Sequence, residues 1–456
     1  MSARSKKTKL PSAEFGDGAL TVVVPAKERH PRAVLPGAGT HVFQGELGLR
    51  PRILLSLVFV FTAAAALAAP DQEQLGEWQG YQVCAALDGG QIAQRCLVGL
   101  LSGWDRLATT HRVARGASVT RLKSAPFEPL IPYKHRGTDV PGVDDFLSRH
   151  RNTGLLILSG DTVLYERYQY RRTRDDRFHS FSMAKTVVAL LVGIALREGK
   201  IGSIDDLAEK YVPALSNTPY GGTRLRHLLT MSSGIEFREE YDGNDDVARL
   251  STKTYGRVGP GGAETVSEFR TREAPAGTRF KYVSADTQVL ALALRAAVRM
   301  PLADYLSVKV WRPMGAEFDA TWHVDAAGHE FGYSGLNATL RDWGRLGMLL
   351  ANDGALNGRQ IVPAEWVRAM TTAEAAHLQV GVATKNNGYG YQTWLINGGK
   401  RYFALLGVRG QAVFVDPLTK TVVVHTAVHA TQRDTDSRAE QFSLFYGVLN
   451  WLKQTS

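Results

Sequence analysis

The pattern of hydrophobic and polar positions changes sharply between residues 155 and 200. Two short apolar or aromatic runs, residues 155–158 and 163–168, flank Ser159-Gly160-Asp161, and this arrangement predicts a β-hairpin. The next run, residues 182–197 (SMAKTVVALLVGIALR), is apolar on nearly every side and predicts a helix buried at the centre of a domain. Gly199 is placed to end that helix.

The middle of the chain is irregular, and strands return toward its end. Helical patterns cover residues 285–298 and 340–351. Two apolar strands, residues 412–415 and 421–428, flank a turn, and a last amphipathic helix is expected from about residue 438 to residue 453. Strands near both ends with helices between them predict an α/β (α+β) fold. It would have one antiparallel sheet, built from the two chain ends, with helices on its faces.

The charge balance separates the first fifty residues from the rest. The chain has 456 residues and a formal net charge of +10. Residues 1–52 hold nine Lys and Arg against four Asp and Glu, whereas the rest of the chain holds 45 basic and 40 acidic residues. A basic tail is more often a targeting or solvated segment than a nucleic-acid surface, so we expect no nucleic-acid partner.

The basic tail leads into an apolar segment. Arg50 and Arg52 precede the apolar run of residues 53–67, which ends in the small residues of Ala66-Leu67-Ala68. This is the pattern of a secretory signal peptide, and the run is shorter than the about 20 apolar residues of a membrane span. We therefore expect an exported protein, periplasmic or secreted. An uncleaved anchor in the inner membrane is the alternative, and a later start of translation would explain the distance from Met1.

The only cysteines, Cys84 and Cys96, follow this segment. In an oxidising compartment they would close a small disulfide loop, and two unpaired buried thiols are the alternative. No Cys and His cluster has the spacing of metal ligands, so no metal is expected. We divide the chain into a basic segment with the signal peptide or anchor (residues 1–68), an N-terminal extension (69–125) and a main domain (126–456).

The start of the buried helix carries the most informative motif, Ser182-Met183-Ala184-Lys185. Positions i and i+3 share one face of a helix, so the Lys185 amine can reach the Ser182 hydroxyl. A serine needs a base to become a nucleophile, and burial lowers the pKa of a lysine enough to serve. The backbone N–H of Ser182 could also bind a developing oxyanion. The alternative is a helix-capping serine with a solvated lysine.

A second segment, residues 275–284 (PAGTRFKYVS), carries Tyr282. Together with the S-x-x-K motif, it resembles the class C side of the serine β-lactamase-related superfamily. Within that superfamily the chain is most similar to the esterases and the 6-aminohexanoate-dimer hydrolases. The resemblance implies an α/β sandwich with a mainly helical lobe, no cofactor, and a role for Tyr282 in proton transfer. The chain has Val283-Ser284 where class C β-lactamases have x-Asn, which weakens a β-lactamase interpretation. A core aromatic is the alternative for Tyr282.

Two further segments complete the resemblance. Residues 407–411 (GVRGQ) resemble the strand that replaces K-T-G in the 6-aminohexanoate-dimer hydrolases, and the N–H of Val408 would complete the oxyanion hole. Without the lysine of K-T-G, a β-lactam carboxylate has no ready partner. Tyr241 lies in a segment that resembles the loop carrying a second tyrosine in contact with the substrate amide, although a loop aromatic could simply pack.

These features predict a serine hydrolase that forms an acyl-enzyme with a small ester or amide. The catalytic residues would be Ser182, Lys185 and Tyr282, and substrate would contact Tyr241 and Val408. Two alternatives share the fold: a penicillin-recognising enzyme (a β-lactamase or D-Ala peptidase), and a non-catalytic cell-wall-binding protein. The sequence does not predict the oligomeric state, and a membrane partner is expected only if the apolar segment stays uncleaved.

Overall fold

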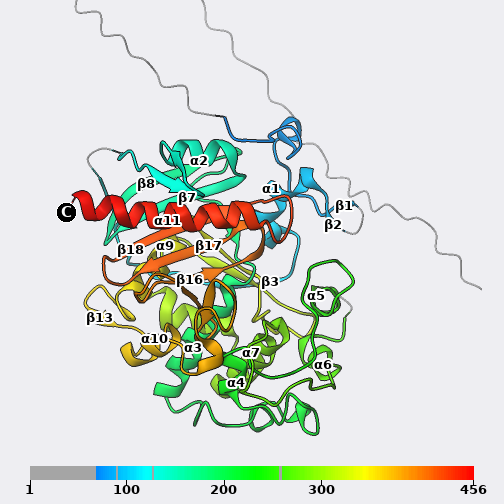
Figure 1. The fold of residues 1–456 in the computed structure, drawn as a ribbon. Coiled ribbons are helices and arrows are strands. Elements are labelled where there is room, and N and C mark those ends of the chain that lie inside the picture. Colours follow the sequence, from blue (N-terminus) through cyan, green and yellow to red (C-terminus); the bar gives the residue numbers. More distant parts are fainter. Residues whose placement is uncertain (1–67, 89–90, 126–127, 256–258, 456) are drawn as a thin grey trace, which may run out of the picture. The chain divides into compact units, whose positions relative to one another are not determined.

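The computed structural model describes residues 68–455, apart from 89–90, 126–127 and 256–258 (Figure 1). The expected signal peptide lies outside the described residues. The main sheet of the described part has eight strands. In sheet order they are β14 (Asn387–Tyr389), β15 (Trp394–Ile396), β16 (Phe403–Leu406), β17 (Ala412–Asp416), β18 (Thr421–Ala427), β7 (Asn152–Ser159), β8 (Thr162–Tyr168) and β4 (Lys123–Ser124).

The sheet joins the two ends of the main domain, as expected. The predicted β7–β8 hairpin forms, and Gly160 takes the left-handed conformation that its turn requires (φ 57°). Strand β18 pairs antiparallel with β7, and Val423 lies opposite Ile157. The prediction of a wholly antiparallel sheet is corrected at β4, which runs parallel to β8. This strand has only two residues and therefore leaves no alternating pattern to recognise.

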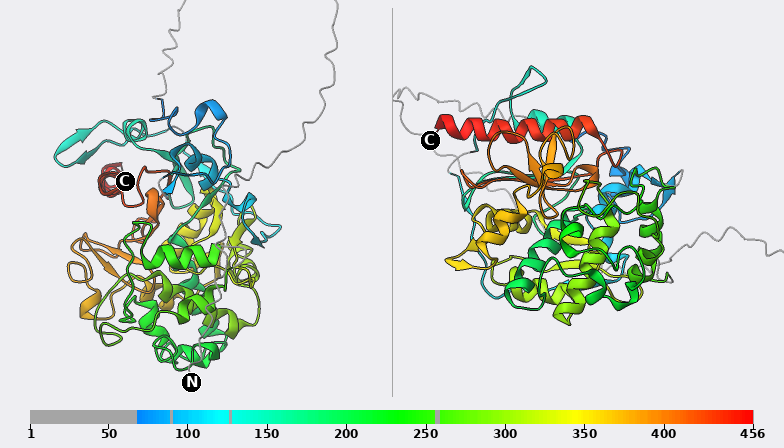
Figure 2. Two further views of the ribbon diagram at one scale, coloured as in Figure 1. Left: turned by 90° about the vertical axis from the view of Figure 1, so that its right-hand side faces the viewer. Right: turned by 60° about the horizontal axis from the view of Figure 1, so that its bottom comes forward.

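Both faces of the sheet are covered by helices. Successive side chains of a strand point to opposite faces, so a strand that is apolar throughout needs packing partners on both sides. Leu155 and Ile157 pack with α2 (Val143–Arg149) and α11 (Thr435–Thr455). Leu156 and Leu158 pack in the larger core with α3 (Met183–Arg197) and α9 (Leu340–Ala351). The right-hand view of Figure 2 shows α11 along one face and the helical lobe beyond the other.

Helix α3 (Met183–Arg197) is the buried helix that the sequence predicts, and Ser182 is its N-cap residue. The predicted helix at 340–351 is also present, and α11 begins three residues before the predicted start. The lobe beyond the sheet contains the helices α4 (Leu225–Leu229), α5 (Asp246–Tyr255), α6 (Gly262–Ser267), α7 (Ser284–Val298), α8 (Leu302–Leu306) and α10 (Ala364–Met370).

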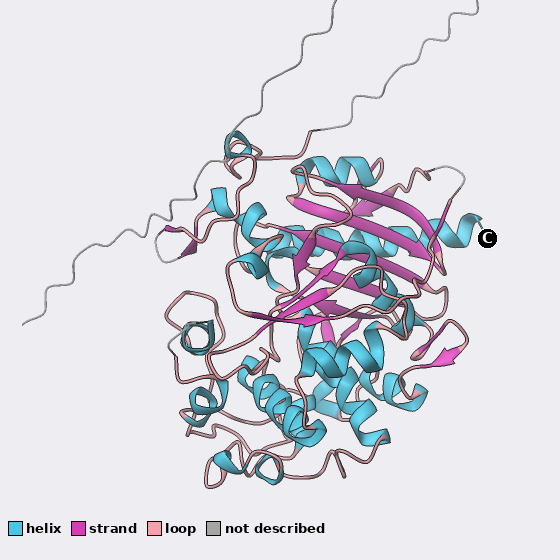
Figure 3. Cartoon of the chain, turned by 180° about the vertical axis from the view of Figure 1, so that it is seen from behind, coloured by secondary structure: helices cyan, strands magenta, loops and turns pink. Residues whose placement is uncertain are grey.

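The described residues also form four smaller sheets, and Figure 3 shows the chain from behind with its strands in magenta. A four-stranded sheet has the order β3 (Thr110–Val113), β10 (Ala320–His323), β11 (Leu336–Thr339) and β9 (Arg177–His179). Three two-stranded pairs are β1 (Leu87–Asp88) with β2 (Gln91–Ile92), β5 (Tyr133–His135) with β6 (Thr138–Val140), and β12 (Ala355–Leu356) with β13 (Arg359–Gln360).

The N-terminal extension is built into these sheets. Its strand β3 pairs with β10, and its strand β4 pairs with β8. A disulfide joins Cys84 to Cys96, whose Cα atoms lie 5.2 Å apart, so the expected pairing is confirmed. Helix α1 (Leu97–Leu101) follows the disulfide. Leu97 and other residues of this helix pack against Tyr170 and Val428 of the main domain.

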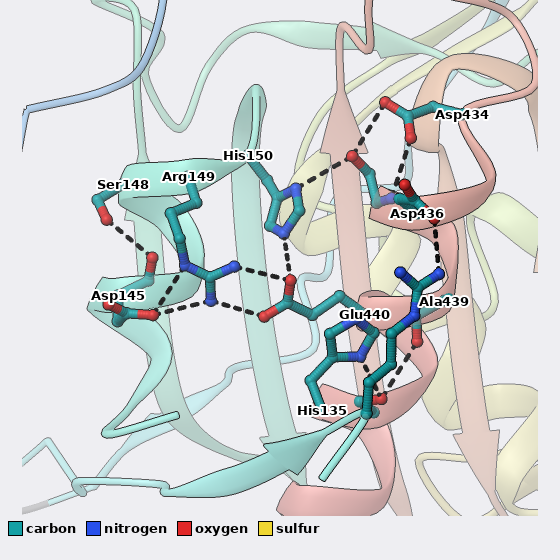
Figure 4. Close-up of polar contacts among 12 residues, drawn as sticks. His135, Asp145, Ser148, Arg149, His150, Asp434, Asp436, Ala439 and Glu440 are labelled. Atoms are coloured by element: carbon teal, nitrogen blue, oxygen red, sulfur yellow. Dashed lines mark hydrogen bonds and ion pairs between the residues drawn. The ribbon is translucent and has the colours of Figure 1, made fainter. Parts of the chain in front are cut away.

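A polar cluster fastens α11 to α2 (Figure 4). Glu440 on α11 accepts hydrogen bonds from Arg149 (2.6 and 2.8 Å) and from the Tyr133 hydroxyl (2.7 Å). His150 Nε2 lies 2.7 Å from the same carboxylate. Burial acts to raise the pKa of Glu440, but these hydrogen bonds outweigh it and lower the pKa to about 2. The carboxylate is therefore more stable in the folded chain than in the unfolded chain.

We expect Glu440→Gln to destabilise the fold at pH 7 by about 2 kcal/mol, since hydrogen bonds to a charged group are lost. The pKa of Glu440 is depressed in the folded wild type. The stabilisation by its carboxylate is therefore complete above pH 4.5, the ordinary pKa, and disappears as the pH falls toward about 2. The difference in free energy of unfolding should therefore shrink across that window. Denaturant unfolding at several pH values measures it. Asp139→Asn, which breaks an exposed ion pair with Lys134, should cost no more than about 0.5 kcal/mol.

Candidate active site

Ser182 lies between β9 and the first turn of α3, where a helix presents free backbone N–H groups. Phe181, the residue before it, has a positive φ of 42°. That conformation is rare for an aromatic residue and turns the chain sharply before the helix starts. The N–H of Ser182 donates to no protein acceptor within the described residues. The side chain and the N–H of one residue are thus both available at the same helix end.

Lys185 is buried, with 1% of its surface exposed. Its Nζ lies 2.9 Å from Ser182 Oγ, 3.1 Å from Ser284 Oγ and 3.2 Å from the carbonyl oxygen of Tyr333. Burial lowers the pKa of Lys185 to about 8, and the charge of Glu239 opposes this shift. The amine can therefore lose its proton close to neutral pH.

The surroundings of the amine determine where its lone pair points. The Ser284 hydroxyl donates to Glu239 Oε1 (2.8 Å), so toward Lys185 it can only accept. The carbonyl of Tyr333 is also only an acceptor. A neutral lysine has two N–H donors and one lone pair. With both donors engaged by these acceptors, the lone pair is left for the hydroxyl proton of Ser182.

Glu239 connects this network to the substrate side. Its second oxygen, Oε2, accepts from the Ser284 N–H (2.7 Å), and Oε1 accepts from the Tyr241 hydroxyl (2.7 Å). Sequence reasoning missed Glu239 altogether and treated Ser284 only as a departure from the class C motif. The two residues lie two positions from Tyr241 and Tyr282 respectively, but only the fold shows that they are hydrogen-bonded to each other.

Tyr282 lies beside the same pair. Its ring centre lies 4.8 Å from Lys185 Nζ. The ring also stacks on Trp394 at 5.4 Å. Burial, followed by the charge of Glu239, raises the pKa of Tyr282 well above its ordinary value. Tyr282 therefore keeps its proton and can donate it.

Tyr241 and Val408 complete the group of predicted site residues. Tyr241 has a φ of 63°, and the Arg433 guanidinium lies 5.0 Å from its ring centre. Val408 begins the short turn Val408–Gly410 between β16 and β17. Like Ser182, it has an N–H with no protein acceptor within the described residues. Two free backbone donors of this kind can together stabilise an oxyanion.

Two adjoining cavities open on Ser182. The first, about 430 Å³ in volume, is bounded by the β1–β2 hairpin and Trp104, and we call it the hairpin cavity. The second, about 410 Å³, is bounded by Tyr282, and we call it the tyrosine cavity. Ser182, Tyr241 and Val408 border both cavities. The structure thus brings all five sequence-predicted residues to one place, together with walls from the N-terminal extension that the sequence did not indicate.

Comparison with known proteins agrees with this arrangement. Residues 143–442 match the family model described as Beta-lactamase. The chain belongs to the beta-lactamase family. A 6-aminohexanoate-dimer hydrolase of Paenarthrobacter ureafaciens is 28% identical to it over 317 residues, which cover 68% of this chain and 81% of that protein. The family resemblance inferred from the sequence motifs is therefore confirmed.

Solved structures of the family share the fold. A Bacillus anthracis protein provisionally named a 6-aminohexanoate-dimer hydrolase superposes with a TM-score of 0.72 at 24% identity, covering 78% of this chain and 94% of that one. A penicillin-binding protein of Bacillus halodurans has a TM-score of 0.52 at 16% identity, covering 65% of this chain and 97% of that one. These likenesses confirm the expected sandwich with a helical lobe.

Membrane-spanning helices and metal-binding clusters are both absent from the part of the chain that the structure describes. No helix among them is both long and apolar enough to cross a membrane. No group of three or more His, Cys, Asp or Glu side chains in the same part of the chain is placed to hold a metal ion.

We expect a carbon-13 NMR titration of Lys185 to give a pKa near 8. Glu239→Gln should lower that pKa further, because it removes the negative charge that favours the ammonium form. Glu240→Gln, which neutralises the exposed neighbouring carboxylate, should leave the pKa of Lys185 unchanged. A pKa in Glu239→Gln equal to or above that of the wild type would contradict this electrostatic account.

Proposed function

We propose that this protein is a serine hydrolase that cleaves a small ester or linear amide through an acyl-enzyme. The observation that carries the proposal is the contact of 2.9 Å between Lys185 Nζ and Ser182 Oγ, in a setting that lowers the pKa of the lysine to about 8. A buried lysine whose other partners are hydrogen-bond acceptors can act as a base, because the lone pair of its neutral amine is free to take the proton of the serine. The names of the Paenarthrobacter relative and of the acyltransferase-active hydrolase EstCE1 support this class of reaction.

In the acylation step, neutral Lys185 takes the hydroxyl proton of Ser182 as Oγ bonds to the carbonyl carbon of the substrate. The oxyanion that forms accepts hydrogen bonds from the N–H groups of Ser182 and Val408. The bond to the leaving group then breaks, the leaving group takes the hydroxyl proton of Tyr282, and the proton on Lys185 replaces it.

In the deacylation step, water attacks the acyl-enzyme and gives its proton to the same pair. The oxyanion re-forms in the same place, and Ser182 Oγ leaves with a proton from Lys185. The product is a carboxylic acid, and every group returns to its starting protonation state. No cofactor enters either step.

The absence of a lysine in the segment of residues 407–411 favours esters and linear amides over β-lactams. The guanidinium of Arg409, the one basic side chain in that segment, donates to the carbonyl oxygens of His429 and Ala430 (2.8 and 2.9 Å).

We also propose that the protein is exported, since the Cys84–Cys96 disulfide is of the kind that forms and persists in oxidising compartments.

We expect Ser182→Ala to abolish both labelling by a fluorophosphonate probe and turnover of p-nitrophenyl acetate, with a fall in rate of about a thousandfold or more. Ser216→Ala, at an exposed serine, should retain both. Strong labelling of the wild type by a fluorescent penicillin would favour the penicillin-recognising alternative. Equal behaviour of Ser182→Ala and wild type would favour a non-catalytic protein.

The rate should depend on pH in the direction set by Lys185. Only its neutral form accepts a proton, so kcat/KM should rise with pH, reach half of its maximum near 8 and then level off. Lys185→Arg should be inactive at every pH, because a guanidinium does not lose its proton in this range. A rate that falls through pH 8 would exclude Lys185 as the base.

A further inference from the structure

The two cavities that meet at Ser182 are chemically different. Tyr282, the proposed donor to the leaving group, borders the tyrosine cavity but not the hairpin cavity. Since the leaving group must depart beside its proton donor, it belongs in the tyrosine cavity. The acyl group, on the other side of the carbonyl carbon, then lies in the hairpin cavity.

One wall of the hairpin cavity comes from the N-terminal extension. Leu87 and Ile92, on the two strands of the β1–β2 hairpin, border the cavity. The disulfide between Cys84 and Cys96 joins the segments on either side of the hairpin. All of these residues precede residue 143, where the match to the family model begins.

The hairpin is tied to the main domain close to the site. Gln432 Nε2 donates to Gln91 Oε1 (3.3 Å), and Gln94 Nε2 donates to the carbonyl oxygen of Ala430 (3.2 Å). Gln432 itself borders both cavities. The disulfide and these contacts hold the described strands β1 and β2 beside Ser182, where they form one wall of the cavity.

Trp104 forms a second, stiffer part of the same wall. Its ring stacks on Tyr255 (5.2 Å between ring centres) and packs against His179 (4.6 Å) and Phe181 (6.4 Å). Phe181 is the residue directly before the nucleophile. The indole also meets the ring of His323 (5.7 Å), and packing against four rings leaves this part of the wall little freedom to move.

The charged groups beside this cavity are already engaged. The Asp245 carboxylate accepts from three backbone N–H groups, those of Glu240, Tyr241 and Ala248. Arg409 Nη1 donates to two backbone carbonyls. Because these charges are engaged within the protein, they are poorly placed to bind an ionic substituent. The leucine, isoleucine and aromatic walls instead favour an apolar one.

We propose that the disulfide-held hairpin and Trp104 form an acyl-binding wall that selects substrates with an apolar acyl group larger than acetyl. This proposal rests on the proposed function, because it assigns the acyl side of the same reaction. The selectivity would then come from the N-terminal extension, which lies outside the region matched to the family, while the chemistry comes from the family core.

The test compares p-nitrophenyl hexanoate with p-nitrophenyl acetate. Both esters have one leaving group, so the contribution of the tyrosine cavity cancels in the ratio of their kcat/KM values. Each methylene that leaves water is worth about fourfold in that ratio, so the wild type should prefer hexanoate by about tenfold or more. The variants Leu87→Asp and Ile92→Asp, which place a charge on the wall, should reduce the preference by about fivefold or more.

Leu418→Asp is the matched control. Leu418 is 69% exposed and Leu87 is 68% exposed, but Leu418 lies in the β17–β18 turn and borders neither cavity. Its hexanoate preference should stay within about twofold of the wild type. Circular dichroism checks that each variant is folded, and the high exposure of Leu87 means that its substitution removes little core packing.

The outcomes separate the two proposals. If Ser182→Ala abolishes turnover but Leu87→Asp and Ile92→Asp keep the wild-type preference for hexanoate, the proposal of an acyl-binding wall is wrong. The proposal of a serine hydrolase is then unaffected. A wild type with no preference for hexanoate overturns the wall in the same way. If Ser182→Ala hydrolyses both esters as fast as the wild type, the proposed function fails, and the wall fails with it.

Discussion

The site depends on one constraint, the burial of the Lys185 amine beside the Ser284 hydroxyl and the Tyr333 carbonyl, which can only accept hydrogen bonds from it. Within the described residues no carboxylate forms an ion pair with the amine. Glu239 is linked to it through the Ser284 hydroxyl. A direct ion pair would raise the pKa of the lysine and keep its proton in place. With one serine between them, the carboxylate orients the amine while burial still lowers the pKa to about 8.

The burial of Lys185 depends on the apolar packing of α3. Lys185 is the only charged residue in the buried stretch of α3, and leucine, valine and alanine side chains enclose the helix around it. The helix packs against α7 and α10, where its Gly193 allows close approach: a Cβ there would lie 2.0 Å from the ring of Trp366. The helix therefore fixes Ser182 and Lys185 rigidly, as a site of this kind requires.

The proposed chemistry and the proposed selectivity have separate structural sources. The proposed reacting groups lie in the part of the chain that matches the family model, at the start of α3, just before α7 and in the turn before β17. The hairpin and Trp104 belong to the extension, which two short strands join to the sheets of the main domain. An added wall of this kind can change which acyl group fits without disturbing the hydrogen bonds around Lys185.

The sequence by itself determined the elements whose evidence is local. The apolar run after Ser182 predicted α3, and the spacing of three residues put Lys185 on the face of Ser182. Apolar or aromatic runs beside turn residues predicted the strands β7, β8, β17 and β18. Tyr282, Tyr241 and Val408 came from family motifs, and the structure brings all three to the tyrosine cavity. Tertiary structure alone decided the hydrogen bonds of Glu239 to Ser284, the parallel pairing of β4, and the wall made by Leu87, Ile92 and Trp104. These contacts join residues dozens or hundreds of positions apart, and no local pattern of polarity records which distant surface a side chain will meet.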